Sequence, residues 1–343
     1  MKRRIGKASL AAALLLVPVA MLLWSIPAHS AQPLDIKITT IQLKQQQMGI
    51  GIDRLSKYIK EKLGDRVRVR AYPGAQLYSG QEEVQAIMKG ELQLAYVIGS
   101  VLEPVDPTTQ MIKLPYLFPD IDTAYKVLDG PVGKRAFANL DRKGISMLGL
   151  ASSADVAIHN SKRPIKMPED FKGLKMRSFG PMGAATLKAM GAMAVVSVPE
   201  ELYSSFQQGM LDGGANPVSV FYERRLYDVQ KYVTDAGMLN ATLINLIGSK
   251  EWWEKLPPDV RGAISEAIQR LIKEERAEIG AQNKKYFDEI AAKGCQVHFQ
   301  TKPEEAAWKK ALQPVYTEFA PQIGADLVKA TQQEVERLSK GKK

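Results

Sequence analysis

Just after its first thirty residues, the chain begins to alternate strand-like and helix-like segments, and this alternation constrains the fold more than any other feature. Apolar and polar residues alternate over 34–41 and 66–72, which is typical of half-buried strands, and 92–98 has the composition of a buried strand. The segments 49–63 and 81–89 have helical spacing, and each is followed by a glycine. Strands joined by helices pair in parallel, so the first half of the chain is predicted to be an α/β domain.

The first thirty residues have the pattern of a secretory signal peptide. Four basic residues stand among the first seven, 10–24 is uncharged and largely apolar, and the small residues Ala28 and Ser30 precede Ala31. A membrane anchor is the alternative, but the apolar run is shorter than the ~20 residues that a spanning helix needs. We therefore expect a signal peptide over 1–30, cleavage between Ser30 and Ala31, and export to the periplasm.

Cysteine content and charge narrow the class of protein further. Cys295 is the only cysteine, so no intramolecular disulfide can form. Loss of the leader removes four positive charges and no negative one, which lowers the formal net charge from +10 to +6. The sequence has no arginine-rich arm and no alternation of basic and aromatic residues, so no nucleic-acid partner is expected. The length that remains is ample for two packed cores.

A second domain is predicted to begin near 152–157, where one strand leads into another at 156–159. Further strands are expected at the segment ending in Arg177 and at 194–198. The next helix is expected to open at Pro199-Glu200-Glu201, since proline and acidic residues favour the first helical turn.

Beyond Asn216 the chain is predicted to be strongly helical, except for a strand around 295–299 that precedes two final helices. The run 258–292 carries few helix breakers and is longer than most helices of globular proteins. Such a helix is long enough to brace two lobes against each other or to reach from one to the other.

Arg177 is the leading candidate for a binding residue. It is a lone arginine in an apolar setting, and its planar guanidinium can hold a carboxylate through two parallel hydrogen bonds. The alternative is a structural ion pair at the surface of a lobe. Asn216 offers both a donor and an acceptor, but it follows Gly213 and Gly214 in what is predicted to be a turn, so it serves either the ligand or the turn.

Several neighbouring residues are weaker candidates for contact with a ligand. Phe179 lies two residues beyond Arg177, so on a strand the two side chains would point the same way and Phe179 could pack against a ligand. Tyr203, Phe206 and Met182 are expected in the core. His159 is expected at the surface or at a strand end rather than at a ligand.

A set of short segments in fixed order carries a family resemblance. These segments are Pro168-Glu169-Asp170-Phe171-Lys172-Gly173-Leu174-Lys175-Met176-Arg177, Gly191-Ala192, Val198-Pro199, Glu201-Leu202-Tyr203, Leu211-Asp212-Gly213, Asn216-Pro217 and Asp228-Val229-Gln230-Lys231-Tyr232-Val233-Thr234. Each is weak alone, but the ordered set resembles the solute-binding subunits of tripartite ATP-independent periplasmic (TRAP) transporters of the DctP type. The resemblance covers essentially the whole chain after the leader.

The resemblance implies an α/β, two-lobed periplasmic-binding-protein fold with hinge strands and a long helix spanning the lobes. Lobe I would comprise 31–154 and about 242–282, and lobe II would comprise 155–241 and about 283–335. The lobes would close on the ligand by a hinge motion.

The resemblance also implies roles for individual residues. The family's carboxylate-binding arginine falls on Arg177 and its asparagine before proline on Asn216. Some members that bind acidic sugars have a second arginine in the strand entering lobe II, and here that position is about Ala157. Ile98 lies in an early strand that is expected at the cleft, in a segment without acidic residues. Asp155 would contact a cationic group or hydroxyls if it faces the cleft. A single arginine matches one carboxylate, so we expect a monocarboxylate with an apolar or hydroxylated body.

The resemblance implies a monomer that uses no cofactor, binds a small organic acid and meets the membrane permease subunits of a TRAP transporter. A solute sensor without a transport role remains an alternative, and a secreted hydrolase is a further one. The sequence carries no G-x-S-x-G elbow, H-E-x-x-H motif or Walker loop, which argues against an enzyme.

Overall fold

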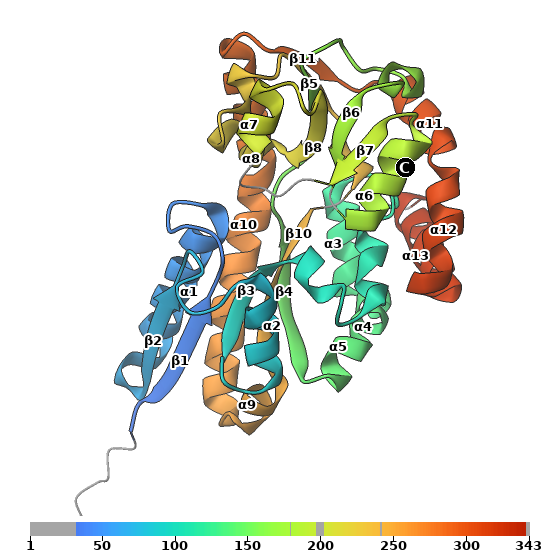
Figure 1. The fold of residues 1–343 in the computed structure, drawn as a ribbon. Helices are drawn as coiled ribbons and strands as arrows, with labels where there is room; N and C mark the ends of the chain where they lie inside the picture. The colour runs from blue at the N-terminus through green and yellow to red at the C-terminus, as the bar shows by residue number, and fades with distance from the viewer. Residues whose placement is uncertain (1–31, 179, 197–201, 241, 341–343) are drawn as a thin grey trace, which may run out of the picture. The chain divides into compact units, whose positions relative to one another are not determined.

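The computed structural model describes residues 32–178, 180–196, 202–240 and 242–340, and these form two mixed β-sheets flanked by helices (Figure 1). Sheet A contains β1 (Leu34–Thr39), β2 (Val67–Tyr72), β3 (Leu94–Ile98), β4 (Ile145–Ser152) and β10 (Leu243–Ser249). Sheet B contains β5 (Val156–Asn160), β6 (Lys175–Ser178), β7 (Met193–Val196), β8 (Gly213–Pro217), β9 (Tyr232–Asp235) and β11 (Gln296–Phe299). We call sheet A with its helices the sheet-A lobe and sheet B with its helices the sheet-B lobe.

Helices cover both sheets. In chain order they are α1 (Gln47–Leu63), α2 (Gly80–Met88), α3 (Ile121–Asp129), α4 (Pro131–Ala136), α5 (Ala138–Arg142), α6 (Gly180–Ala189), α7 (Leu202–Gln207), α8 (Val218–Glu223), α9 (Lys250–Lys255), α10 (Pro258–Ala292), α11 (Lys302–Ala311), α12 (Gln313–Ile323) and α13 (Ala325–Lys340). Short 3₁₀ helices connect several of them, including one over Pro107–Lys113.

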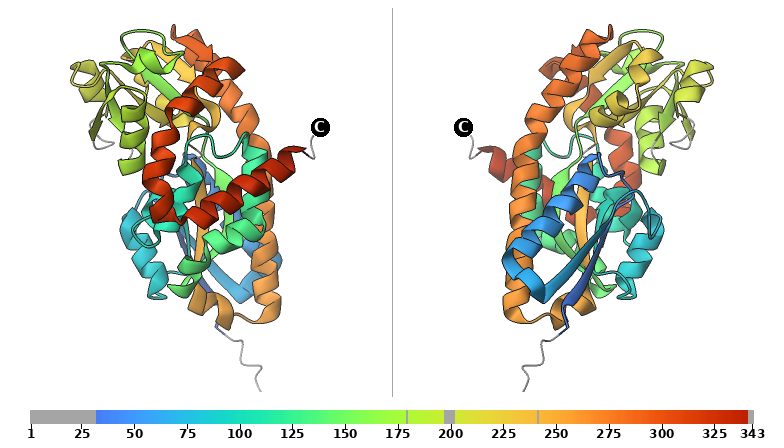
Figure 2. Two further views of the ribbon diagram at one scale, coloured as in Figure 1. Left: turned by 90° about the vertical axis from the view of Figure 1, so that its right-hand side faces the viewer. Right: turned by 90° about the vertical axis from the view of Figure 1, so that its left-hand side faces the viewer.

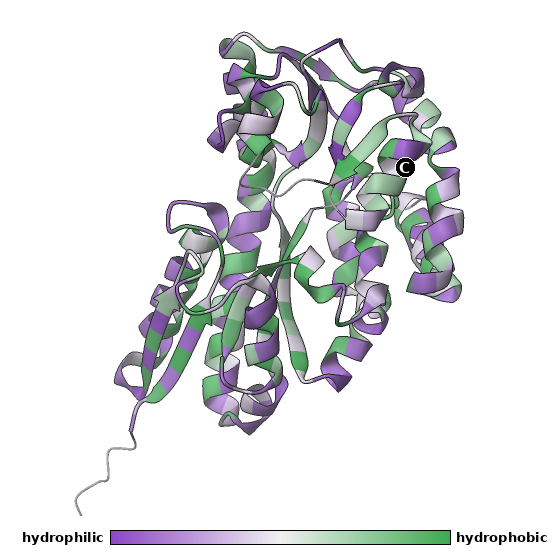
Figure 3. Cartoon of the chain, viewed as in Figure 1, coloured by the Kyte–Doolittle hydropathy of each residue, from purple (hydrophilic) through white to green (hydrophobic). Residues whose placement is uncertain are grey.

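Sheet A confirms the parallel pairing expected from the strand–helix alternation. Its order is β2-β1-β3-β10-β4, with β1 parallel to both β2 and β3. Purple and green bands alternate along β1 and β2 in Figure 3, which is the alternation that the sequence displays. One face of the sheet packs on α1 and α10, where Ile36, Ile52 and Leu271 belong to a single buried cluster.

The prediction that the chain is strongly helical beyond Asn216 is wrong for two segments. β10 runs antiparallel between β3 and β4 at the centre of sheet A, and β9 pairs with β5 and β11 in sheet B. All seven residues of β10 are buried, with Ile244 in the cluster on one face and Ile247 in the cluster on the other. A strand covered on both faces shows no alternation, so its pattern does not differ from that of a short buried helix.

Sheet B has the order β11-β9-β5-β8-β6-β7. The segment predicted as a glycine-rich turn is strand β8, which is antiparallel to β5 and parallel to β6. Its glycines are explained by close packing across strands rather than by a turn, because a Cβ on Gly213 would lie 2.1 Å from the carbonyl oxygen of His159.

The helix α10 links the two lobes. Its first half packs on α1 and β4 and its second half on α8 and β11, and Figure 2 shows it running along both sheets. The chain also passes from sheet A to sheet B between β4 and β5, and returns before β10. The predicted fold of two lobes with crossing strands and a long connecting helix is thus present, whereas the exact lobe boundaries stay a prediction.

Candidate functional site

Two adjoining cavities are lined by residues from both lobes. The narrow cavity has a volume of about 80 Å³ and the wide cavity about 430 Å³. The residues that line both are Lys113, Arg177, Ser178, Pro217 and Thr242. The narrow cavity is mostly apolar, whereas the wide cavity adds the hydroxyl groups of Ser100, Thr109 and Ser153. Both cavities are therefore largely apolar, and the wide one adds these few hydroxyl groups.

Arg177 reaches the cavities from the interior of sheet B. It lies on β6, its residue is 4% exposed, and its register partner on β8 is Gly214. A Cβ added to Gly214 would lie 3.2 Å from the Cβ of Arg177, so the absence of a side chain there leaves room for the arginine. The guanidinium is thus placed by the hydrogen-bonded ladder of the sheet rather than by a loop, which favours precise positioning.

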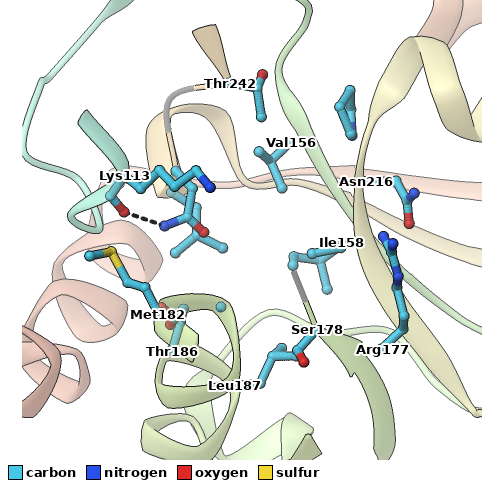
Figure 4. A pocket seen from close by; sticks show the side chains of 15 residues that line it. Lys113, Val156, Ile158, Arg177, Ser178, Met182, Thr186, Leu187, Asn216 and Thr242 are labelled. Atoms are coloured by element: carbon cyan, nitrogen blue, oxygen red, sulfur yellow. Dashed lines mark hydrogen bonds between the residues drawn. The ribbon is translucent and has the colours of Figure 1, made fainter. Parts of the chain in front are cut away.

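Asn216 stands two residues further along β8 and belongs to a buried polar chain. Its Oδ1 is 3.1 Å from Nε2 of His159, and Nδ1 of His159 is 3.0 Å from Oε1 of Gln230. Asn216, His159 and Gln230 are each at most 1% exposed. Figure 4 shows Asn216 next to the guanidinium end of Arg177. Burial, with a smaller contribution from the charge of Arg177, lowers the pKa of His159 to about 4, so its imidazole is neutral near pH 7.

Lys113 brings a second cation to the cavities from the opposite side. It ends the 3₁₀ helix Pro107–Lys113, and its carbonyl oxygen accepts a 2.6 Å hydrogen bond from Nδ2 of Asn240. Its amine forms an ion pair with Glu103, which lines the wide cavity. In Figure 4 the side chains of Lys113 and Arg177 lie on opposite sides of the cavity. Nothing in the sequence distinguishes Lys113 or Glu103 from surface charges, so sequence reasoning missed both.

The structure brings together three of the residues singled out from the sequence and separates two others from them. Arg177 and Asn216 line the narrow cavity, and Arg177 and Ile98 line the wide one. Ala157 and Asp155 are not among the described residues that line either cavity. Phe179 and the expected helix start at Pro199-Glu200-Glu201 lie outside the described residues, as does the leader over 1–30.

Ala157 pairs with Asn216 across β5 and β8 and is fully buried, in the same apolar cluster as Phe206 and Phe221. A larger residue at Ala157 would have to displace that cluster. Of the two places expected for His159, the surface is wrong, because the residue is wholly buried, whereas it does lie near a strand end, as the residue before the last one of β5. Met182, expected in the core, is buried and lines the narrow cavity.

Asp155 lies at the crossing from β4 to β5 and faces α10. Burial and the nearby carboxylate of Asp235 raise its pKa to about 6, although a hydrogen bond from Asn283 on α10 opposes the rise. Its main-chain oxygen accepts from the backbone N–H of Val218. These contacts place Asp155 in the structure that connects the lobes.

The described ranges show no sign of a metal site or of a membrane-spanning helix. No group of three or more histidine, cysteine, aspartate or glutamate residues there has the arrangement that could hold a metal ion. Nor does any helix among the described residues combine the length and apolar character that a membrane span requires.

Comparison with known proteins gives a consistent result. A family model described as bacterial extracellular solute-binding protein, family 7 (DctP), matches residues 39–322. The C4-dicarboxylate-binding periplasmic protein DctP of Rhodobacter capsulatus is 31% identical over 312 residues, which cover 89% of this chain and 92% of that protein.

Solved structures agree with the sequence comparisons. A TRAP periplasmic solute-binding protein from Ochrobactrum anthropi, with a C-terminus bound in its ligand-binding pocket, is 27% identical with a TM-score of 0.85, covering 91% of this chain and 97% of that one. A TRAP periplasmic solute-binding protein from Ralstonia eutropha with bound (S)-2-acetolactate is 28% identical with a TM-score of 0.78, covering 88% and 99%.

Proposed function

Because this chain belongs to family 7 of the bacterial extracellular solute-binding proteins, the DctP family, we propose that it captures a small organic monocarboxylate between its lobes and delivers it to a TRAP membrane permease. Capture would take place in the periplasm, after export directed by the leader. Binding would draw the lobes together by a hinge motion, and exclusion of water would strengthen the contact between guanidinium and carboxylate.

The charge of the cavity lining carries the preference for a monocarboxylate. Among the described residues that line the two cavities, the charged ones are Arg177, Lys113 and Glu103. Lys113 is already paired with Glu103, so the formal charge of the lining sums to one positive charge. One carboxylate balances this charge, whereas a dicarboxylate would bring one negative charge too many into a partly enclosed site.

The wide cavity suggests what the rest of the ligand is like. Hydroxyl groups of Ser100, Thr109 and Ser153 line it, together with the Lys113–Glu103 pair. Hydroxyl groups and an ion pair offer both donors and acceptors, which suit the hydroxyl or carbonyl groups of a short oxygenated acid. The volume of about 430 Å³ is within the range of small-molecule sites.

The relatives support capture of an organic acid and differ in the number of carboxylates. The Rhodobacter capsulatus protein is named for C4-dicarboxylates, whereas (S)-2-acetolactate, which is bound in the Ralstonia eutropha protein, carries a single carboxylate. The choice between the two classes therefore depends on this chain's own lining residues.

Isothermal titration with a matched pair of acids tests the proposal. L-Malate and 2,4-dihydroxybutanoate differ only in that a CH₂OH group of the second replaces one carboxylate of the first. We expect the monocarboxylate to bind at least tenfold more tightly, since a second carboxylate would meet a lining that is already neutralised.

Arg177→Met is the matched control, because methionine keeps much of the length of the side chain and loses the guanidinium. Binding of either acid should fall by about 100-fold or more in this variant. Tighter binding of malate than of its partner would contradict the monocarboxylate assignment, and unchanged binding in Arg177→Met would contradict carboxylate capture at this site.

A further inference from the structure

His159 is a buried histidine that carboxylate capture, as proposed above, does not use. The rings of Phe206 and Phe221 pack against its imidazole, with centroids 5.3 and 4.9 Å away. Gln230 lies 3.0 Å from one ring nitrogen and Asn216 lies 3.1 Å from the other. The ring is thus fixed between two amides, one of which belongs to a residue that lines the narrow cavity.

The protonation of His159 limits what these amides can do. The ring is fully buried and has the positive Arg177 nearby, and burial is the larger cause of its lowered pKa. A neutral imidazole has one N–H, so it donates to one amide oxygen only. The amide at the other nitrogen must therefore present its NH₂ group to the ring.

The surroundings of the two amides decide which one is rotated so that its NH₂ group, instead of its oxygen, faces the imidazole. If Asn216 turned, its NH₂ would lie beside the Arg177 guanidinium, because Figure 4 shows the Asn216 oxygen on that side. Its oxygen would then lie away from that positive charge. If Gln230 turned instead, the loss would be the 3.2 Å hydrogen bond from its Nε2 to the carbonyl oxygen of Val229. The second loss is the smaller one, and it leaves the proton of His159 on Nε2.

We propose that His159 is a positioning residue for ligand capture: its Nε2–H holds the oxygen of Asn216, so that the NH₂ of Asn216 is kept as a hydrogen-bond donor for the ligand carboxylate. The proposal rests on carboxylate capture but concerns a residue that is not among the described lining of either cavity.

Nitrogen NMR of the ligand-free protein tests the tautomer directly. The chain has three histidines, so the combined His29→Gln and His298→Gln substitutions leave His159 as the sole imidazole. At pH 7 the spectrum should show a protonated Nε2, which couples to both ring C–H protons, and a bare Nδ1. A proton on Nδ1, or on both nitrogens, would overturn the proposal. This measurement needs no ligand, so it decides the question even if the protein binds no carboxylate.

Two substitutions that replace the imidazole by amide side chains of different length test the effect of His159 on ligand binding. In His159→Gln the new amide nitrogen falls near the position of the ring Nε2, whereas in His159→Asn it falls near the position of Nδ1. With 2,4-dihydroxybutanoate at pH 7, we expect His159→Gln to bind within about threefold of the unsubstituted protein and His159→Asn to lose roughly tenfold.

Melting temperatures of the two variants provide the control for folding, and we expect them to be similar. Equal losses in both variants, or no loss in His159→Asn, would contradict the positioning role. Failure of carboxylate capture itself has a different signature, which is unchanged binding in Arg177→Met.

Discussion

The two sides of the ligand cavity are built in different ways. On the sheet-B side, Arg177 and Asn216 stand on adjacent strands and are 4% and 1% exposed. On the sheet-A side, Lys113 ends a short 3₁₀ helix and pairs with Glu103, and their side chains are 27% and 19% exposed. One side is thus a buried anchor held by strand register, and the other is a partly exposed ion pair held by a connection.

This difference suggests that the two sides of the cavity have different roles in ligand binding. Strand positions cannot shift without breaking the ladder, so Arg177 and Asn216 are suited to the group that every ligand of the site shares. Connections between elements tolerate substitution, so Lys113 and Glu103 are suited to the part of the ligand that varies. We therefore expect substitutions on the sheet-B side to change overall affinity and those on the sheet-A side to change selectivity.

Arg177→Lys is the sharpest test of the anchor. It keeps the positive charge and loses the planar fork of donors, so if geometry matters most, monocarboxylate affinity should fall on the order of 100-fold. Titration calorimetry measures the loss, with Lys175→Arg on the exposed end of β6 as the control. Affinity close to that of the unsubstituted protein would show that charge alone is sufficient and would remove the contrast between the two sides.

Glu103→Gln tests the other side. The substitution leaves the amine of Lys113 without a balancing charge, so the lining would sum to two positive charges. Binding of L-malate relative to 2,4-dihydroxybutanoate should rise roughly tenfold, because a second carboxylate gains a partner. Lys113→Met should act in the opposite direction. Equal changes for both acids in Glu103→Gln would mean that this side does not select.

The same contrast explains what the sequence could predict. Arg177 was identifiable chiefly because the segments around it resemble a family whose carboxylate-binding arginine falls on this position. Lys113 and Glu103 come together because of the route that the chain takes between β3 and α3. No periodic pattern in the sequence predicts such a route. The role of β8 was misjudged for a related reason: Gly213 and Gly214 signal a turn in the sequence, whereas in the fold they allow close contact with β5 and β6.

Gly214→Ala tests whether the anchor depends on that close contact. The new Cβ would lie 3.2 Å from the Cβ of Arg177, so the arginine would have to move by a few tenths of an ångström. Affinity for the monocarboxylate should fall by roughly fivefold, a smaller loss than that from removing the guanidinium fork. Gly262→Ala on α10 is the control, because its Cβ would meet no atom within 4 Å. It should leave affinity unchanged and stabilise the helix by about 0.5–1 kcal/mol.

Asp155→Asn tests whether the chain crossing between the lobes takes part in carboxylate binding, and we expect no change in ligand affinity. The folded protein raises the pKa of Asp155 to about 6 from an ordinary value near 3.8, chiefly by burial, so the folded state holds its proton to higher pH than the unfolded state. Stability associated with this carboxyl is therefore lost as pH rises from about 4 to about 6 and remains lost above that range. Asparagine stays neutral at every pH, so the melting temperature of Asp155→Asn relative to the unsubstituted protein should be higher at pH 8 than at pH 4. Asp65→Asn, at an exposed position, is the matched control for the loss of a carboxylate. A loss of ligand affinity in Asp155→Asn would show that the crossing contributes to binding, and that carboxylate capture does not depend on the strand residues Arg177 and Asn216 alone.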